Sequence, residues 1–157
     1  MSSRSATSSA AESSEEDRLL GALLRLSHQA VVVELTAGLE QAGFSDIPPS
    51  LNAAMQALWN APHGTRATEL ASAARITKQS MGALIDQLEE RGYVERIDDP
   101  SDKRAKLVRL TKRGREAGRI MRAVVRRIEN DWAKRIGHNR LADLKQTLRD
   151  LLASLEG

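Results

Sequence analysis

The sequence predicts a mainly α-helical fold in which two short helices joined by a tight turn precede a two-stranded β-hairpin. Three observations lead to this prediction. Apolar residues recur at three- and four-residue spacing over most of the chain, and strict alternation is confined to the region 93–110. Aromatic residues make up only 3% of the 157 residues, so aliphatic helix packing must supply the core. Gly and Pro fall between the periodic segments, where they end helices and form turns.

The N-terminal part of the chain predicts a tail followed by a long helix. Residues 1–14 are rich in Ser and Ala without apolar periodicity, which is typical of a disordered tail. We expect a first helix from near Ser14 to about Ala42, followed by Gly43 as its C-terminal cap. Its apolar stripe consists of Leu20, Leu23, Leu24, Ser27, Val31, Leu35 and Leu39.

Three shorter helices should follow. Ser50, after two prolines, is expected to cap a helix with the apolar residues Leu51, Met55, Leu58 and Trp59. Thr65 or Thr68 is expected to cap the next helix, which buries Leu70 and Ala71. Arg75-Ile76 forms the turn, Thr77 caps the following helix, and Gly92 ends it.

The segments 93–97 and 105–110 alternate apolar and polar residues, as half-buried strands do, and residues 98–102 form the loop between them. A hairpin this short must pack on the helices to be stable. Thr111 should cap a long helix that Gly137 ends, and Asn139 should cap the last helix. The last helix carries leucines at alternating three- and four-residue spacing, like a coiled-coil seam: Leu141, Leu144, Leu148, Leu151 and Leu155.

The long first and last helices expose more apolar surface than one small chain can cover, and a second copy is the simplest partner. We therefore divide the chain into a tail (1–14), an N-terminal dimerisation helix (15–45), a helix-turn-helix with its hairpin (46–110) and C-terminal helices that complete the dimer interface (111–157).

Charge is distributed unevenly along the chain. The net charge is only +3, with a pI near 9.6. Eleven cations lie between Lys103 and Arg127, opposed only by Glu116, and acidic residues gather instead at 12–17 and 89–102. Such clustering is expected of a protein that binds a polyanion, although part of it is also explained by a solvated helix face.

Several functional classes are disfavoured. The chain has no cysteine, which excludes disulfides, cysteine–zinc sites and thiol switches. The only histidines, His28, His63 and His138, lack metal-ligand spacing, and no serine lies in a nucleophile elbow, so we expect neither a metal, a cofactor nor an enzyme. Without a membrane-length apolar run or the apolar core of a signal peptide, we expect a cytoplasmic protein with no membrane partner.

The chain resembles the MarR family of winged helix-turn-helix transcription regulators. The resemblance rests on the ordered set ATELA, then LEERGYVER, then DDPSDKRAKLVRLTKRG, and it covers nearly everything after the tail. It implies a homodimer whose terminal helices interlock and whose two winged lobes read a palindrome. It also implies a repressor that releases DNA when a small, often phenolic, ligand binds. The chain departs from the family pattern at Gly82 and Ala83, which leave the fourth helix bare where Ser or Thr and then Arg are common.

The first turn of the fourth helix is the candidate base-reading element. When a helix enters the major groove end-on, the residues of its first turn lie next to the edges of the bases. Lys can donate to guanine and Gln can bridge adenine, so we assign base reading to Lys78, Gln79, Ser80 and Gly82. The alternative is that these are ordinary exposed helix residues.

The hairpin is the candidate wing. Its DNA-contacting residues are predicted to be Asp102, Lys103, Arg104 and Lys106. The Arg104 guanidinium suits a narrow minor groove, and Asp102 is expected to hold that guanidinium in one orientation. The alternative is a solvated ion pair that contributes little. Phosphate contacts are assigned to Thr68, Thr77 and Arg109.

The function predicted is sequence-specific, double-stranded DNA binding by a homodimeric transcription regulator. The alternative is a winged-helix module that binds proteins without reading DNA. An aromatic or phenolic effector is a further expected partner, with His28, Trp59 and Trp132 as its tentative contacts, although each is also a plausible core residue.

Overall fold

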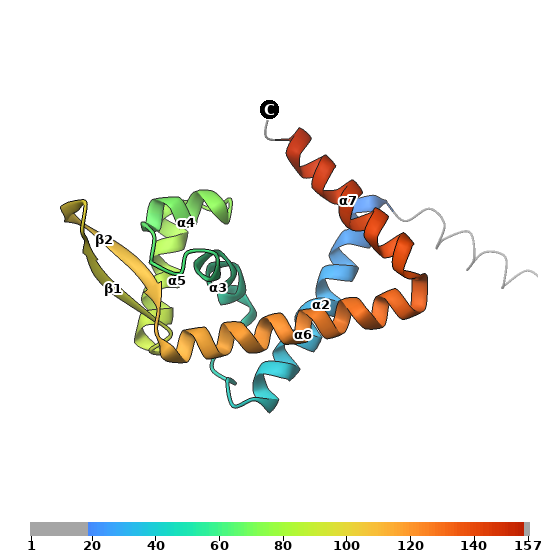
Figure 1. Cartoon of the computed structure of the whole chain (residues 1–157), viewed down its shortest axis with the longest axis horizontal. Helices are drawn as coiled ribbons and strands as arrows, with labels where there is room; N and C mark the ends of the chain where they lie inside the picture. The colour runs from blue at the N-terminus through green and yellow to red at the C-terminus, as the bar shows by residue number, and fades with distance from the viewer. Residues whose placement is uncertain (1–18, 156–157) are drawn as a thin grey trace, which may run out of the picture. The chain divides into compact units, whose positions relative to one another are not determined.

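The computed structural model describes residues 19–155, which form a mainly helical chain with one antiparallel hairpin (Figure 1). This confirms the predicted fold class. The chain divides into two compact units, residues 1–33 and residues 34–157, and each is described by itself. The predicted tail, residues 1–14, lies outside the described residues.

The first described helix, α2, spans Leu20–Gln41. The predicted start near Ser14 falls on residues 14–18, which lie outside the described part. Within the second unit, the last turns of α2 bury Leu35, Gly38 and Leu39. A Cβ atom added at Gly38 would meet the Val124 side chain, so this glycine lets α2 lie close against the later helix that carries Val124.

A 3₁₀ turn, η1 (Pro49–Leu51), leads directly into α3 (Asn52–Trp59). The prediction that Ser50 caps this helix is therefore wrong, because Ser50 lies inside the 3₁₀ turn. Leu51 occupies the cap position in a helical conformation and makes no side-chain cap bond.

The two helices of the predicted helix-turn-helix are α4 (Ala67–Ala73) and α5 (Lys78–Glu90). Neither Thr65 nor Thr68 caps α4, because the helix begins one residue after Arg66, which occupies the cap position. The predicted turn at Arg75 is present, and this residue adopts a left-handed backbone with φ of 53°.

The predicted caps of α5 are confirmed. Thr77 accepts a hydrogen bond from the Ser80 amide at 3.1 Å, and the helix ends at Glu90. Gly92 follows with φ of 74°, a conformation that glycine adopts without steric cost.

The hairpin consists of β1 (Val94–Asp99) and β2 (Asp102–Leu110), paired in register from Val94 opposite Leu110 to Asp98 opposite Lys106. Both strands extend further toward the turn than predicted. The register shifts between Asp98 and Asp99, which is a bulge next to the turn.

The long helix α6 spans Lys112–Ile136, and α7 spans His138–Ser154. Thr111 caps α6 as predicted, accepting from the Gly114 amide at 3.1 Å. The predicted cap Asn139 is wrong, because Gly137 occupies the cap position of α7 and Asn139 lies in its first turn.

Tyr93 joins α5, the hairpin and α6. Its amide donates to the Leu88 carbonyl of α5 at 2.8 Å, and its carbonyl accepts from the Thr111 amide at 3.0 Å. A Cβ atom at Gly114 would overlap that same carbonyl, so only glycine permits this approach of α6.

The fully buried Tyr93 ring ends in a polar cluster. Its hydroxyl donates to Asp46 in the loop after α2, and Arg113 of α6 donates to both Asp46 oxygens at 3.0 and 2.9 Å. The Arg113 guanidinium also lies 4.6 Å from the centre of the Tyr93 ring. Burial and the hydrogen bond to Asp46 raise the pKa of Tyr93, so it stays a protonated donor at neutral pH.

A second glycine sets the distance between α3 and α6. Trp59, half-buried at the end of α3, lies against Gly118, where a Cβ atom would overlap the indole ring. The Arg122 guanidinium, one helical turn further along α6, lies 5.1 Å from the centre of the same ring. The indole therefore lies against the α6 backbone and close to a cation of the same helix.

We predict opposite stability changes for two glycine-to-alanine substitutions in helices. Gly118→Ala should lower the free energy of unfolding by about 1–3 kcal/mol, because the new methyl group overlaps Trp59. Gly82→Ala should raise it by about 0.5–1 kcal/mol, because a Cβ atom at Gly82 meets nothing within 4 Å and alanine is the better helix former. Urea unfolding followed by circular dichroism measures both, and equal effects would contradict the packing described.

Candidate nucleic-acid interface

The first turn of α5 presents its polar side chains to solvent. Lys78, Gln79 and Ser80 are all exposed, whereas Met81 behind them is fully buried. The Ser80 and Thr77 hydroxyls lie 2.8 Å apart, so both also take part in the helix cap. Lys78 and Gln79 therefore have side chains with the reach and freedom to approach base edges.

The surface beyond this turn is bare. Gly82 is half-buried and Ala83 is exposed, and space around Gly82 is open to 4 Å. Gly82 offers no side-chain donor or acceptor. Any contact at this position would be made through the backbone or by close approach of the DNA.

Helix α5 is fixed to the hairpin by a charged contact. Arg96 on β1 forms ion pairs with Asp86, at 2.5 Å, and with Glu89, both on α5. Sequence reasoning missed this role of Arg96, although Arg96 is the last residue of the LEERGYVER run. The contact holds the hairpin in a fixed position relative to α5.

Two predicted DNA-contacting cations of the hairpin have partners on the opposite strand. Lys106 lies 2.5 Å from Asp98, and Arg109 lies 2.7 Å from Glu95. Both pairs join residues that face each other in the strand register. Their DNA contacts stay a prediction, and each would require the cation to leave or share a carboxylate.

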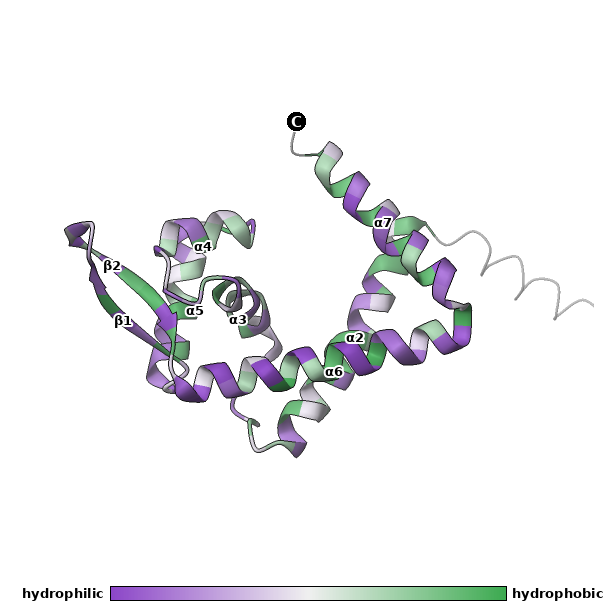
Figure 2. Ribbon diagram, in the orientation of Figure 1, coloured by the Kyte–Doolittle hydropathy of each residue, from purple (hydrophilic) through white to green (hydrophobic). Residues whose placement is uncertain are grey.

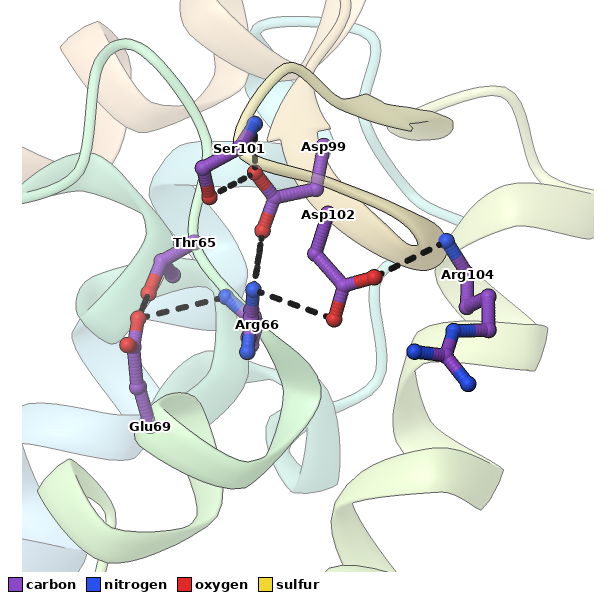
Figure 3. Close-up of polar contacts among 7 residues, drawn as sticks. All are labelled: Thr65, Arg66, Glu69, Asp99, Ser101, Asp102 and Arg104. Atoms are coloured by element: carbon purple, nitrogen blue, oxygen red, sulfur yellow. Dashed lines mark hydrogen bonds and ion pairs between the residues drawn. The ribbon is translucent and has the colours of Figure 1, made fainter.

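Arg104 differs from these cations. Its side chain is exposed, and among the described residues no carboxylate lies within ion-pair distance of its guanidinium. The expectation that Asp102 holds this guanidinium is not met. Asp102 Oδ1 instead accepts from the Arg104 backbone amide at 3.1 Å (Figure 3). Nothing is described for the Lys103 side chain.

The hairpin turn is held by a cluster that the sequence did not reveal (Figure 3). Arg66, the residue before α4, donates to Asp99 Oδ2 from Nε at 2.9 Å and from a terminal nitrogen at 2.6 Å. Asp99 is the one buried charged residue of the described part, at 5% exposure. A charged pair 33 residues apart leaves no local sequence signal, although an Arg at a helix-cap position is unusual.

The same cluster keeps Asp99 ionised. Hydrogen bonds from the Ser101 hydroxyl and amide, and then from Arg66, lower the pKa of Asp99 to about 2. A carboxylate whose pKa falls on folding stabilises the fold above its unfolded value of 3.8, and this contribution is lost as the pH falls towards 2. The turn is therefore fully held at neutral pH, beside two further acids, Asp102 and Glu69.

The predicted phosphate contacts lie around α4 and α5. Thr68 is exposed in the first turn of α4 and stays a candidate donor. The Thr77 hydroxyl oxygen already accepts a hydrogen bond from the Ser80 amide. Its proton can be donated to a phosphate only when it is not donated to the Ser80 hydroxyl.

The two tryptophans among the tentative effector residues, Trp59 and Trp132, are not brought together within the second unit. His28 is exposed and belongs to the first unit. Trp59 lies against Gly118, and Trp132 lies 14 residues further along α6, a rise of about 21 Å. The residue beside Trp59 that sequence reasoning missed is Arg122.

In the described residues 19–155, no group of three or more His, Cys, Asp or Glu side chains is placed to hold a metal ion. None of the helices in this range is long and apolar enough to cross a membrane.

Comparisons with known proteins agree with this geometry. Residues 53–105, which run from α3 into the wing, match a model of the MarR family. The transcriptional repressor CouR bound to a 23-mer DNA duplex is 25% identical, over 88% of this chain and 93% of that one, with a TM-score of 0.66. A probable transcriptional regulator from Pseudomonas aeruginosa is also 25% identical, over 88% and 98%, with a TM-score of 0.67. CouR from Rhodococcus jostii RHA1 bound to p-coumaroyl-CoA shares the fold, at 24% identity over 84% and 90%, with a TM-score of 0.68.

Proposed function

The chain is a DNA-binding regulator of the MarR family, and from this premise we propose that it binds a palindromic operator as a homodimer and acts as an effector-responsive repressor. The DNA-reading part of this proposal rests on two structural features that are held in a fixed position relative to each other. An exposed polar helix turn, at Lys78 and Gln79, is fixed through Arg96 to a hairpin whose tip presents the unpaired Arg104 guanidinium. A major-groove reader beside a minor-groove cation fits this geometry.

Repression is the direction that the comparison supports, since CouR is described as a repressor and is bound to a DNA duplex. A repressor of this kind needs two reading heads about one helical turn apart on the same face of the duplex. A two-fold dimer supplies them.

The surface of α7 supports dimer formation. Its hydrophobic residues recur along the helix (Figure 2), and exposure of the leucines is high: 46% at Leu144, 40% at Leu151, 50% at Leu152 and 69% at Leu155. In the first unit, Leu20, Leu23 and Leu24 of α2 are exposed as well. Apolar rows of this length are typical of surfaces that a partner covers.

An aromatic, anionic effector fits the neighbourhood of Trp59. The half-buried indole offers a flat apolar surface, and the exposed Arg122 guanidinium beside it offers two parallel donors to a carboxylate or phosphate. CouR binds p-coumaroyl-CoA, which carries both an aromatic ring and phosphates, and this supports the same ligand class here.

The first prediction separates base reading from backbone anchoring. Gln79→Ala should weaken binding to the operator by about 1–3 kcal/mol and leave binding to scrambled duplex nearly unchanged. Arg104→Ala should weaken binding to both duplexes and reduce the salt slope by about one unit per protomer. Fluorescence anisotropy at several salt concentrations, on an operator selected from genomic fragments, measures these effects.

Gln56→Ala and Arg126→Ala are the matched controls, because both residues are exposed on helices outside the proposed interface. If both test variants bind the operator like the wild type, the groove assignment is wrong. If the wild type selects no operator at all, the bare surface at Gly82 and Ala83 would favour a protein-interaction module instead.

The second prediction concerns assembly. The protein should sediment at micromolar concentration with twice the 17.2 kDa mass of the chain. Leu151→Glu should shift it to the monomer, because a charge in an apolar interface is costly to desolvate. Ala153→Glu, exposed about 200° around the same helix, should leave the dimer intact. A wild-type monomer that binds the operator specifically would rule out the dimer.

The third prediction concerns the effector. Trp132→Phe leaves Trp59 as the single tryptophan, and its fluorescence should change when p-coumaroyl-CoA is added. Arg122→Ala in that background should weaken binding by about 1.5–3 kcal/mol, the contribution of a hydrogen bond to a charged group. Arg135→Ala should bind like its parent. Equal binding by all three proteins would exclude Arg122 from the effector site.

A further inference from the structure

The hairpin turn is joined to the helix-turn-helix through the two residues that precede α4. Thr65 pairs with Val108 of β2, donating to its carbonyl at 3.0 Å and accepting from its amide at 2.9 Å. The next residue, Arg66, is thereby placed beside the hairpin with its backbone fixed. Its side chain reaches the turn at the far end of the strands.

Arg66 satisfies a carboxylate that is almost fully buried. Two of its nitrogens donate to Asp99 Oδ2, at 2.9 and 2.6 Å, while the Ser101 amide and hydroxyl donate to Oδ1 at 2.8 and 2.6 Å. The Arg66–Asp99 pair differs from a solvated ion pair, which contributes little to stability, because Asp99 is only 5% exposed and has four hydrogen-bond donors. Without Arg66, one oxygen of a buried charge would lose both of its donors.

The same guanidinium reaches the other side of the turn. A terminal nitrogen of Arg66 lies 3.8 Å from Asp102 Oδ2, and Asp102 Oδ1 accepts from the Arg104 backbone amide at 3.1 Å. Figure 3 shows the resulting line of contacts from Arg66 through Asp102 to Arg104. The backbone position of Arg104 thus depends on a residue outside the hairpin.

We propose that Arg66 is a positioning residue for DNA binding: it locks the hairpin turn to the helix-turn-helix, so that Arg104 is already oriented before it meets the duplex. The inference rests on the proposed DNA-binding function. It assigns Arg66 no contact with DNA. Its guanidinium faces Asp99 and Asp102, and preorganisation lowers the entropic cost of binding that a mobile wing would otherwise carry.

The position of Arg66 supports this role over a purely local one. It occupies the cap position of α4, where Ser, Thr, Asp and Asn stabilise a helix by accepting from its first amides. Arginine has no acceptor and makes no such bond. The helix therefore gains nothing from this side chain, and the fixed geometry of its fork serves the two carboxylates of the turn.

The test uses Arg66→Thr, which removes the guanidinium and supplies a capping hydroxyl, so that α4 is retained. In the free protein, hydrogen exchange at the Ser101 and Arg104 amides should accelerate at least about tenfold, while the amides of α5 keep their wild-type rates. Asp99→Asn should produce the same pattern from the other side of the pair. Arg66→Lys, which keeps the charge and loses the fork, should lie between Arg66→Thr and the wild type.

DNA binding supplies the second readout. Arg66→Thr should weaken binding about 2- to 10-fold with an unchanged salt slope, the size expected for one long side chain that must be ordered on binding. In the Arg104→Ala background it should cause no further loss. A slope reduced by about one unit would mean that Arg66 touches a phosphate, and additive losses would mean that it does not act through Arg104; either result overturns the proposal.

Unchanged exchange at Ser101 and Arg104 also overturns it. If the wild type binds no duplex, the proposed function fails by itself. The exchange rates of the free protein still decide whether Arg66 locks the turn.

Discussion

The approach of α6 to the backbone of Tyr93 is the constraint on which the arrangement of α5, the hairpin and α6 depends. One residue closes the recognition helix through its amide, begins the hairpin, and receives the cap of α6 on its carbonyl. The approach is possible only because Gly114 lacks a side chain. The backbone of Tyr93 thus joins α5, the hairpin and α6. The buried ring of Tyr93, through its bonds to Asp46 and Arg113, also holds this residue in place.

Among the hairpin cations whose side chains the structure describes, Arg104 alone has no carboxylate partner. Lys106, Arg109 and Arg96 each lie against a carboxylate of the same chain, whereas Arg104 extends from the turn without one among the described residues. The count of cations in the sequence therefore overstates the number that are ready to meet a polyanion. The paired cations act first to hold the strands together and to hold the wing on α5.

The sequence allowed the fold to be predicted well, because its signals are local. Periodicity placed the helices, alternation placed the strands, and Thr77 and Thr111 were recognisable as caps three residues before the amides that they accept from. The failures share a cause. Ser50, Thr65, Thr68 and Asn139 are good capping residues, but the chain enters those helices through a 3₁₀ turn, a strand-like bridge or a glycine. At the candidate site, Lys78, Gln79 and Arg104 were predicted from their positions in the motif, and their DNA contacts stay a prediction. The bond between Arg66 and Asp99 joins residues 33 apart and required the folded chain.

The open space at Gly82 bears on how such a protein changes its DNA preference over time. In α5, Met81, Ile85 and Leu88 are buried in the core, so altering them disturbs the fold. At position 82 an added Cβ atom meets nothing within 4 Å, so a small side chain can be introduced there without a clash. A gene duplicate could acquire a different operator through this single codon while its regulator remained fully folded at each step. The helix thus has one position, on the surface that the proposed function assigns to DNA, where a substitution can change DNA recognition without disturbing the core.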